Sequence, residues 1–169
     1  MSTKAGARDP TMVPPPAVPR TPGLLRYACG MRLELTRAGD YAVRAMLALA
    51  EVDAASPVWL STGRISTSMG IPPAFLPRVM RDLMRAGLIQ ARTGRSGGYR
   101  LARSGAAISL MDVIAAVEPD EDPPRCVLRG IACGSDGRCA VHEPFIAARA
   151  AMTDRLAATT LDTLRRSGV

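Results

Sequence analysis

Apolar residues recur at helical spacing along most of the chain after residue 30. In "TRAGDYAVRAMLALAEV", which begins at Thr36, the side chains of Tyr41, Ala45, Met46 and Leu49 fall on one helical face. This stretch predicts an amphipathic helix whose apolar face packs into a core. We find no internal repeat.

Two shorter helices around a glycine turn are predicted next. The stretch "LSTGRISTSMG" offers Ser61 or Thr62 as a helix cap and Gly70 as a stop. In "PPAFLPRVMRDLMRAG", three prolines fall near the first turn, where proline is tolerated, and Gly87 ends the helix. Two helices so arranged form a helix-turn-helix. The residues expected to face inward from the second helix are Phe75, Val79, Leu83 and, as a further candidate, Leu76.

A hairpin and another helix follow. In "LIQARTGRSGGYRLAR", two apolar stretches flank a glycine-rich tip, where Gly97 and Gly98 allow the turn. A hairpin directly after the second helix makes the unit a winged helix-turn-helix. The stretch "SLMDVIAAVE" predicts a short helix capped by Ser109.

The C-terminal stretch "PFIAARAAMTDRLAATTLDTLRR" predicts one helix of about twenty residues with an apolar stripe through Phe145, Met152, Leu156 and Leu164. Little chain remains to cover this stripe, so we expect it to pair with a second copy. The predicted fold class is mainly α with a small β-hairpin wing. We expect a disordered proline-rich extension over 1–30 and a winged helix-turn-helix over 31–105. Residues 106–169 are expected to form a cysteine-containing, cluster-binding loop and a dimerisation helix.

The charge distribution separates these regions. The chain has 169 residues and a net charge of +7. Residues 31–105 carry 11 arginines and 5 acidic residues, whereas residues 106–169 carry 7 arginines and 9 acidic residues. Basic charge confined to one segment favours a polyanionic partner over ordinary solvated charge. No run of 18 apolar residues suggests a membrane span, and the start lacks the apolar run of a signal peptide. We therefore expect a cytoplasmic protein with reduced thiols.

The helix-turn-helix and the wing supply the candidate DNA-binding residues. The start of the second helix would enter the major groove, where Arg78 can make a bidentate contact with guanine. The arginines of the wing would meet a minor groove or phosphates. The alternative is a winged-helix protein–protein module. The candidates are Ala74, Phe75 and Arg78 at base edges, Arg81 or Arg85 nearer the backbone, and Arg92, Arg95 and Arg100 in the wing.

A second candidate site is the segment "CVLRGIACGSDGRCAVH". It contains Cys126, Cys133, Cys139 and His142, the only histidine, in a C-x6-C-x5-C-x2-H pattern. Thiolates and imidazole suit an iron–sulfur cluster or a zinc ion, and the glycines allow the backbone to wrap closely around either. A structural zinc and three unrelated cysteines are the alternatives. The remaining cysteine, Cys29, is expected to be incidental.

In their order, "MRLELTRAGDYAVRAMLALA", the helix-turn-helix, "GLIQARTGRSGGYRLAR", "ISLMDVIAAVE" and the cysteine triplet resemble the Rrf-two (Rrf2) family of winged-helix transcription factors, in particular its IscR-type and NsrR-type members. The resemblance spans about residues 31–165. It implies a homodimer crossed through its C-terminal helices on a dyad-symmetric DNA operator. It also implies a 2Fe–2S or 4Fe–4S cluster on Cys126, Cys133 and Cys139, although the first gap is one residue longer than is common in the family.

The resemblance leaves two candidates for a fourth ligand. IscR-like members place a histidine just after the third cysteine, as His142 is here. Some NsrR-like members use an aspartate on the first helix of the other subunit, and Asp40 stands at that point. We favour His142. Departures from the family at Ala74, Pro77 and Thr93 indicate that the operator need not be that of a relative.

The sequence therefore predicts a transcriptional regulator, expected to be a repressor, that senses nitric oxide, redox state or iron–sulfur supply. Loss or modification of the cluster would change the packing of its loop and thereby the spacing of the two recognition helices. A cluster-free thiol switch and a zinc-stabilised regulator are the alternatives, with an iron–sulfur or thiol oxidoreductase more distant. We expect no enzyme, because the single histidine leaves no catalytic arrangement outside the cysteine loop, and no small-molecule substrate is evident.

Overall fold

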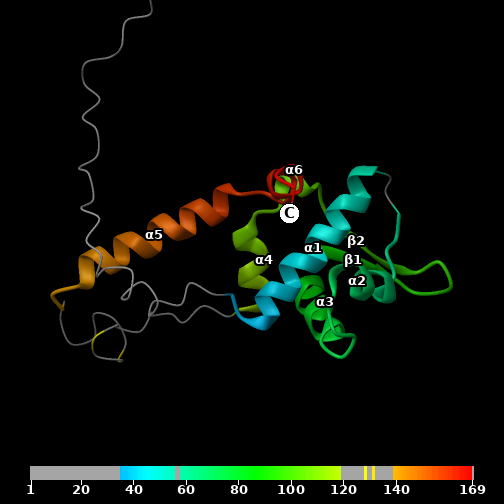
Figure 1. The fold of residues 1–169 in the computed structure, drawn as a ribbon, viewed down its shortest axis with the longest axis horizontal. Helices are drawn as coiled ribbons and strands as arrows, with labels where there is room; N and C mark the ends of the chain where they lie inside the picture. Colours follow the sequence, from blue (N-terminus) through cyan, green and yellow to red (C-terminus); the bar gives the residue numbers. More distant parts are fainter. Residues whose placement is uncertain (1–34, 56–57, 119–127, 129–130, 132–138, 169) are drawn as a thin grey trace, which may run out of the picture. The chain divides into compact units, whose positions relative to one another are not determined.

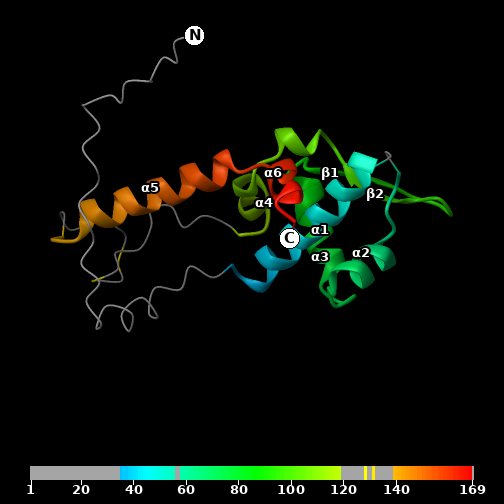
Figure 2. The ribbon, with the colours of Figure 1, turned by 45° about the horizontal axis from the view of Figure 1, so that its top comes forward.

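The first helix, α1 (Arg37–Ala55), lies at the centre of the fold in the computed structural model, which describes residues 35–55, 58–118, 128, 131 and 139–168. It contacts α2, α3, α4, α6 and strand β2 (Figures 1 and 2). Ala45, Met46 and Leu49 of its predicted face are buried, and Tyr41 is partly buried against the core. The sequence-based prediction for this helix is confirmed.

The helix-turn-helix consists of α2 (Thr62–Met69) and α3 (Leu76–Arg85). The Ser61 side chain caps α2 by accepting a hydrogen bond from the Arg64 amide. Gly70 ends that helix in the left-handed conformation, with φ of 62°, which glycine adopts without steric cost.

The inward face of α3 differs from the prediction at one residue. Phe75 occupies the position before the helix and is 49% exposed, so its expected burial is wrong. Leu76 opens the helix instead and is fully buried. The inward set therefore follows helical spacing from that residue and consists of Leu76, Val79, Met80 and Leu83.

The predicted wing is present. Strands β1 (Ile89–Arg92) and β2 (Gly98–Leu101) pair antiparallel, with Ile89 opposite Leu101 and Arg92 opposite Gly98. The segment before α2 also joins this hairpin, because Leu60 forms an isolated bridge with Tyr99.

A short 3-10 helix, η3 (Gly105–Ala107), leads into α4 (Leu110–Val117). Ser109 caps α4 as predicted, and it does so as part of a capping box. The Ser109 hydroxyl accepts from the Asp112 amide at 3.0 Å, and the Asp112 carboxylate accepts from the Ser109 amide at 3.0 Å.

The C-terminal stretch forms two helices, so the prediction of one continuous helix is wrong. They are α5 (His142–Ala158) and α6 (Leu161–Arg166). Thr159 and Thr160 between them are extended, because the Thr159 carbonyl accepts from the Leu110 amide and the Leu161 amide donates to the Ile108 carbonyl. This pairing with the start of α4 interrupts the helical hydrogen bonds.

The two C-terminal helices differ in burial. Leu161 of α6 is fully buried in the core, whereas no residue of α5 is buried. Phe145, Ile146 and Met152 of α5 are each more than a third exposed. None of the described helices is long and apolar enough to cross a membrane.

Candidate functional site

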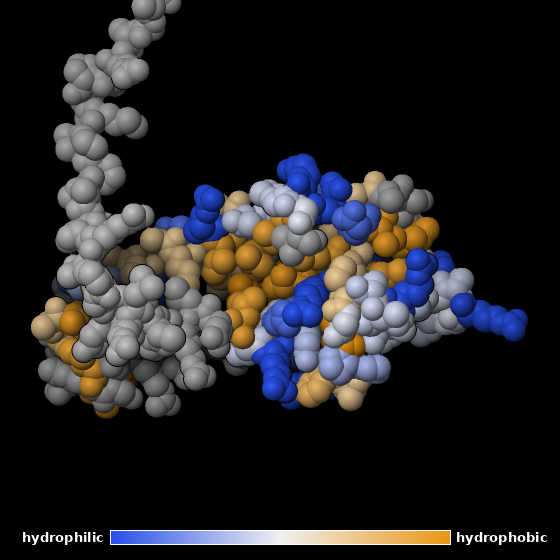
Figure 3. Space-filling view, viewed as in Figure 1, coloured by the Kyte–Doolittle hydropathy of each residue, from blue (hydrophilic) through white to orange (hydrophobic). Residues whose placement is uncertain are grey.

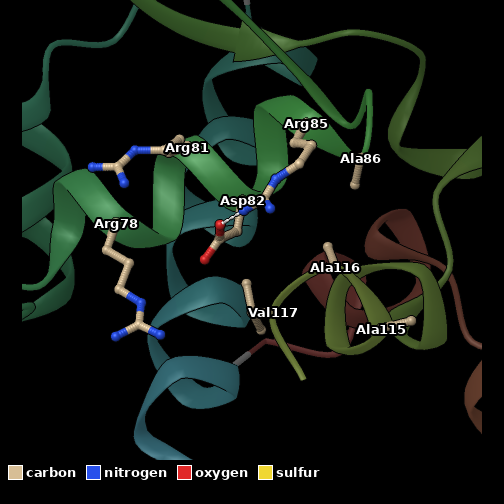
Figure 4. A pocket seen from close by; sticks show the side chains of 8 residues that line it. All are labelled: Arg78, Arg81, Asp82, Arg85, Ala86, Ala115, Ala116 and Val117. Carbon is tan, nitrogen blue, oxygen red and sulfur yellow. Dashed lines mark hydrogen bonds and ion pairs between the residues drawn. The ribbon is translucent and has the colours of Figure 1, made fainter. Parts of the chain in front are cut away.

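The outer side of α3 carries the arginines predicted to face nucleic acid. Arg78, Arg81 and Arg85 are exposed and, together with Asp82, border an open hollow of about 750 Å³ between α3 and α4. Figure 4 shows Arg85 turned back to its ion pair with Asp82, whereas Arg78 and Arg81 extend from the helix in separate directions. Arg78 and Arg81 are therefore better placed than Arg85 to reach an external anion.

The residues at the start of α3 are also exposed. Ala74 and Phe75 precede the helix, and the Phe75 ring lies 5.8 Å from the Tyr41 ring of α1, centroid to centroid. This aromatic contact fixes Phe75 at the surface beside Arg78. The structure thus brings the three residues predicted to reach base edges to one end of one helix.

The predicted wing arginines divide into two kinds. Arg95 is exposed near the tip, which is coloured hydrophilic at the right of Figure 3. Arg92 donates to the Ser96 carbonyl at 2.6 Å, and Arg100 donates from two of its nitrogens to the Gln90 side-chain oxygen at 3.1 and 2.9 Å. Both of these guanidinium groups are therefore held in place on the hairpin.

Trp59 is a residue of the wing surface that the sequence did not point to. The guanidinium carbons of Arg92 and Arg100 lie 4.8 and 4.7 Å from the centroid of its ring. The available signal was that this is the only tryptophan and that it stands two residues before the Ser61 cap. Its contact with the wing depends on strand pairing across the Leu60 bridge, which the sequence did not indicate.

Two of the three cysteines predicted to bind a cluster, Cys126 and Cys133, lie outside the described residues. Cys139 is half-buried, and His142 is the first residue of α5. The His142 amide donates to the Cys139 carbonyl at 3.0 Å, so a tight turn joins these two predicted ligands. Among the described residues no three His, Cys, Asp or Glu side chains are placed to hold a metal ion.

The alternative ligand, Asp40, lies in the first turn of α1. Its carboxylate accepts from Arg44 Nε at 2.9 Å, in a pair whose side chains are 41% and 47% exposed. An exposed pair of this kind contributes little to stability, so Asp40 could exchange Arg44 for another partner at small cost.

Comparison with known proteins places the chain in a family. Residues 35–167 match the Rrf2 family model, described as "Iron-dependent Transcriptional regulator". The transcriptional regulator IscR of Vibrio vulnificus is 37% identical over 132 residues, which cover 78% of this chain and 77% of that protein.

Comparison with solved structures leads to the same family. CymR of B. subtilis, described as its global cysteine regulator, covers 81% of this chain and 99% of its own, with 26% identity and a TM-score of 0.68. The oxidized form of Staphylococcus aureus CymR covers 79% and 96%, with 26% identity and a TM-score of 0.62. These proteins are regulators of transcription and not enzymes. The chain therefore belongs to the Rrf2 family of winged-helix transcriptional regulators.

Proposed function

We propose that this regulator binds a dyad-symmetric DNA operator as a homodimer and represses transcription from it. The observation that carries the proposal is the exposure of Arg78 and Arg81 on α3 and of Arg92 and Arg95 on the wing that follows it. The start of α3 enters the major groove, where Ala74, Phe75 and Arg78 meet base edges. The remaining arginines, namely Arg81, Arg92, Arg95 and Arg100, contact phosphates or the minor groove.

Selection from a randomised duplex library tests DNA binding. The protein should enrich an inverted repeat, and Arg78→Ala should weaken binding to it by about 1–3 kcal/mol while relaxing the preference at one base pair per half-site. Arg166→Ala removes the same charge from an exposed position on α6 and serves as the control. A protein that binds no duplex, or binds all equally, contradicts the proposal. A reporter gene behind the selected site then separates repression from activation.

We further propose that Cys126, Cys133 and Cys139 hold an iron–sulfur cluster, with His142 as the fourth ligand and Asp40 of the partner subunit as the alternative. The tight turn between Cys139 and His142 supports this donor set, because it keeps a thiolate and an imidazole close in the chain. Such a cluster would supply a centre that oxidants and nitric oxide modify and that a shortage of iron removes. Because His142 is the first residue of α5, a change at the cluster would act directly on that helix.

The visible spectrum of anaerobically purified protein, with iron and zinc assays on the same sample, tests the cluster. A broad visible band with stoichiometric iron is expected, and its shape begins to separate 2Fe–2S from 4Fe–4S. Cys133→Ala should abolish the band and change operator affinity. His142→Ala and Asp40→Ala should then alter the spectrum unequally, the larger change identifying the ligand. A colourless protein containing zinc would instead indicate a structural metal.

A thiol switch without a cluster is the second candidate. The observation that favours it is the similarity to CymR, one of whose solved structures is an oxidized form. In this case the purified protein would be colourless and free of metal, and mild oxidation would change its operator affinity reversibly. A cysteine-free variant that still responds to oxidant would contradict both the cluster and the thiol switch.

A further inference from the structure

The segment before α2 runs along the open edge of the wing. The Leu60 amide donates to the Tyr99 carbonyl at 2.9 Å, and the Tyr99 amide donates to the Leu60 carbonyl at 2.9 Å. Adjacent residues of an extended chain point to opposite faces. Leu60, only 4% exposed, lies on the core face with Tyr99, so Trp59 lies on the outer face with Arg92 and Arg100.

Gly98 makes this approach possible. It stands opposite Arg92 in the hairpin, and a Cβ atom built on it would lie 2.5 Å from the Leu60 carbonyl oxygen. The outer face therefore lacks a side chain at this position. Because Gly98 has no side chain, Trp59 reaches Arg92 across the strand as well as Arg100 beside it, with their guanidinium carbons 4.8 and 4.7 Å from its ring centroid.

The stacking orders the two arginines without neutralising them. An aromatic face attracts a guanidinium group and fixes its plane, while the N–H groups at the edge stay available to an oxyanion. Ser96 and Gln90, the hydrogen-bond partners of these arginines, are uncharged. The ion pairs formed within the described part of the chain involve Arg44, Arg85 and Arg103, and none involves a wing arginine.

A hollow of about 540 Å³ lies beside this stack. It separates the start of α2, which contributes Ser61 and Arg64, from the wing, which contributes Arg92 and Arg95. The described residues that line it include three arginines and no acidic residue. An open and positively charged hollow of this kind, beside the tip of a hairpin, suits a phosphate group of a long polyanion.

We propose that this hollow binds a backbone phosphodiester of duplex DNA and that Trp59 is the positioning residue that holds Arg92 for it, while Arg100 stacks on the same ring without lining the hollow. The assignment rests on the proposed DNA-binding function and adds a contact that a protein with an aliphatic residue at position 59 would lack. Because the contact is to phosphate, it contributes to affinity for any sequence and leaves base preference unchanged.

The test measures binding of the selected duplex, fluorescently labelled, over a series of salt concentrations. Trp59→Ala should weaken binding at least tenfold and reduce the slope of log affinity against log salt by about one, while the preferred sequence stays the same. Trp59→Phe, which keeps an aromatic face, should recover most of the affinity. Trp59→Ala combined with Arg92→Ala should lose less than the product of the two separate losses, because both changes remove the same contact.

Tryptophan fluorescence provides a second measurement, because the emission of Trp59 should change on DNA binding only if the residue lies at the contact. Trp59 is the only tryptophan, so its emission reports on the hollow alone. Saturating duplex should change this emission in the wild type and also in Arg78→Ala, which weakens a different contact. The Trp59→Phe variant, checked for folding by circular dichroism, guards against loss of structure in Trp59→Ala.

The outcomes separate the two proposals. If the wild type binds the duplex and Trp59→Ala binds it with the same affinity and salt slope, the hollow is not a phosphate site, although the DNA-binding function stands. A loss that Trp59→Phe does not recover, with an unchanged salt slope, assigns Trp59 to the core and overturns the positioning role. If the wild type binds no duplex, both proposals fall.

Discussion

Gly98 is the residue on which the geometry of the wing depends most directly. Its φ is 154°, and the Leu60 backbone occupies the space where a side chain would begin. Gly63 is the opposite case, because it lies in α2 with nothing within 4 Å of a built Cβ.

We predict opposite effects of alanine at these two glycines. Gly98→Ala should lower the free energy of unfolding by about 1–3 kcal/mol, because the Leu60 bridge must open to admit the methyl group. Gly63→Ala should raise it by about 0.5–1 kcal/mol, because a helical glycine costs backbone entropy. Urea denaturation of both variants measures the difference. A neutral Gly98→Ala would show that the bridge is dispensable.

The capping box of α4 predicts a pH dependence. The hydrogen bond from the Ser109 amide is the largest of the effects that lower the pKa of Asp112 below its ordinary value of 3.8. Desolvation is the next largest and raises the pKa, and smaller lowering effects come from the Ser109 hydroxyl and from the charge and hydrogen bond of Arg103. A lowered pKa in the folded state means that the contribution to stability is complete above 3.8 and is lost as the pH falls through the folded-state pKa.

Wild type should therefore be more stable than Asp112→Asn at neutral pH, and the difference should vanish at low pH. Because the Asp112 side chain is 43% exposed, solvent screening limits the difference to about 0.5 kcal/mol. Thermal denaturation at several pH values from 2 to 7 gives the measurement. A gap between the two proteins that stays constant over this range would contradict the role of the carboxylate.

At the scale of elements, the break between α5 and α6 decides which C-terminal leucine belongs to the core. The extended Thr159 and Thr160 turn α6 so that Leu161 is fully buried, while Leu164 is only partly buried. The stripe predicted for one continuous helix assigned Leu164 to the same face as Leu156.

Leu161→Ala should lower the free energy of unfolding by about 2–5 kcal/mol, as expected for a fully buried leucine. Leu164→Ala is the matched control, with the same atoms removed from a less buried position of the same helix, and should cost clearly less. Chemical denaturation of the two variants gives the comparison. Equal costs would contradict the deeper burial of Leu161 in the core.

At the scale of the whole molecule, the apolar surface points to self-association. Figure 3 shows hydrophobic residues gathered over α4, where Leu110, Met111 and Val117 are only partly buried. The side chains of Phe145, Ile146 and Met152 add apolar surface on α5, which has no buried residue. Exposed apolar surface of this kind is typical of an interface between subunits.

Ile146→Glu should therefore shift the protein from dimer toward monomer and raise the dissociation constant of the dimer at least tenfold, because it places a charge in an apolar interface. Ala54→Glu adds the same charge at an exposed position of α1 and should leave the dimer intact. Light scattering after gel filtration, over a range of concentrations, measures the change. A wild-type protein that is monomeric at high concentration would contradict the proposed dimer.

Local patterns in the sequence were sufficient to predict most of the elements. Helical spacing placed α1 and α4, and the caps at Ser61 and Ser109 and the stop at Gly70 were correct. The glycine-rich tip indicated the hairpin. These features depend on residues close together in the chain, so their physical cause is present in any short window of sequence. The charge distribution predicts which segment faces a polyanion, and this remains a prediction.

Only the tertiary structure decided the features that depend on residues far apart. The break at Thr159 results from pairing with Ile108 and Leu110, some fifty residues earlier in the chain. The exposure of Phe75 depends on where α3 begins relative to the core, and the stack on Trp59 depends on a bridge to Tyr99. Helical spacing alone carries no information on such long-range hydrogen bonds, because they form only once the packed core brings the two segments together.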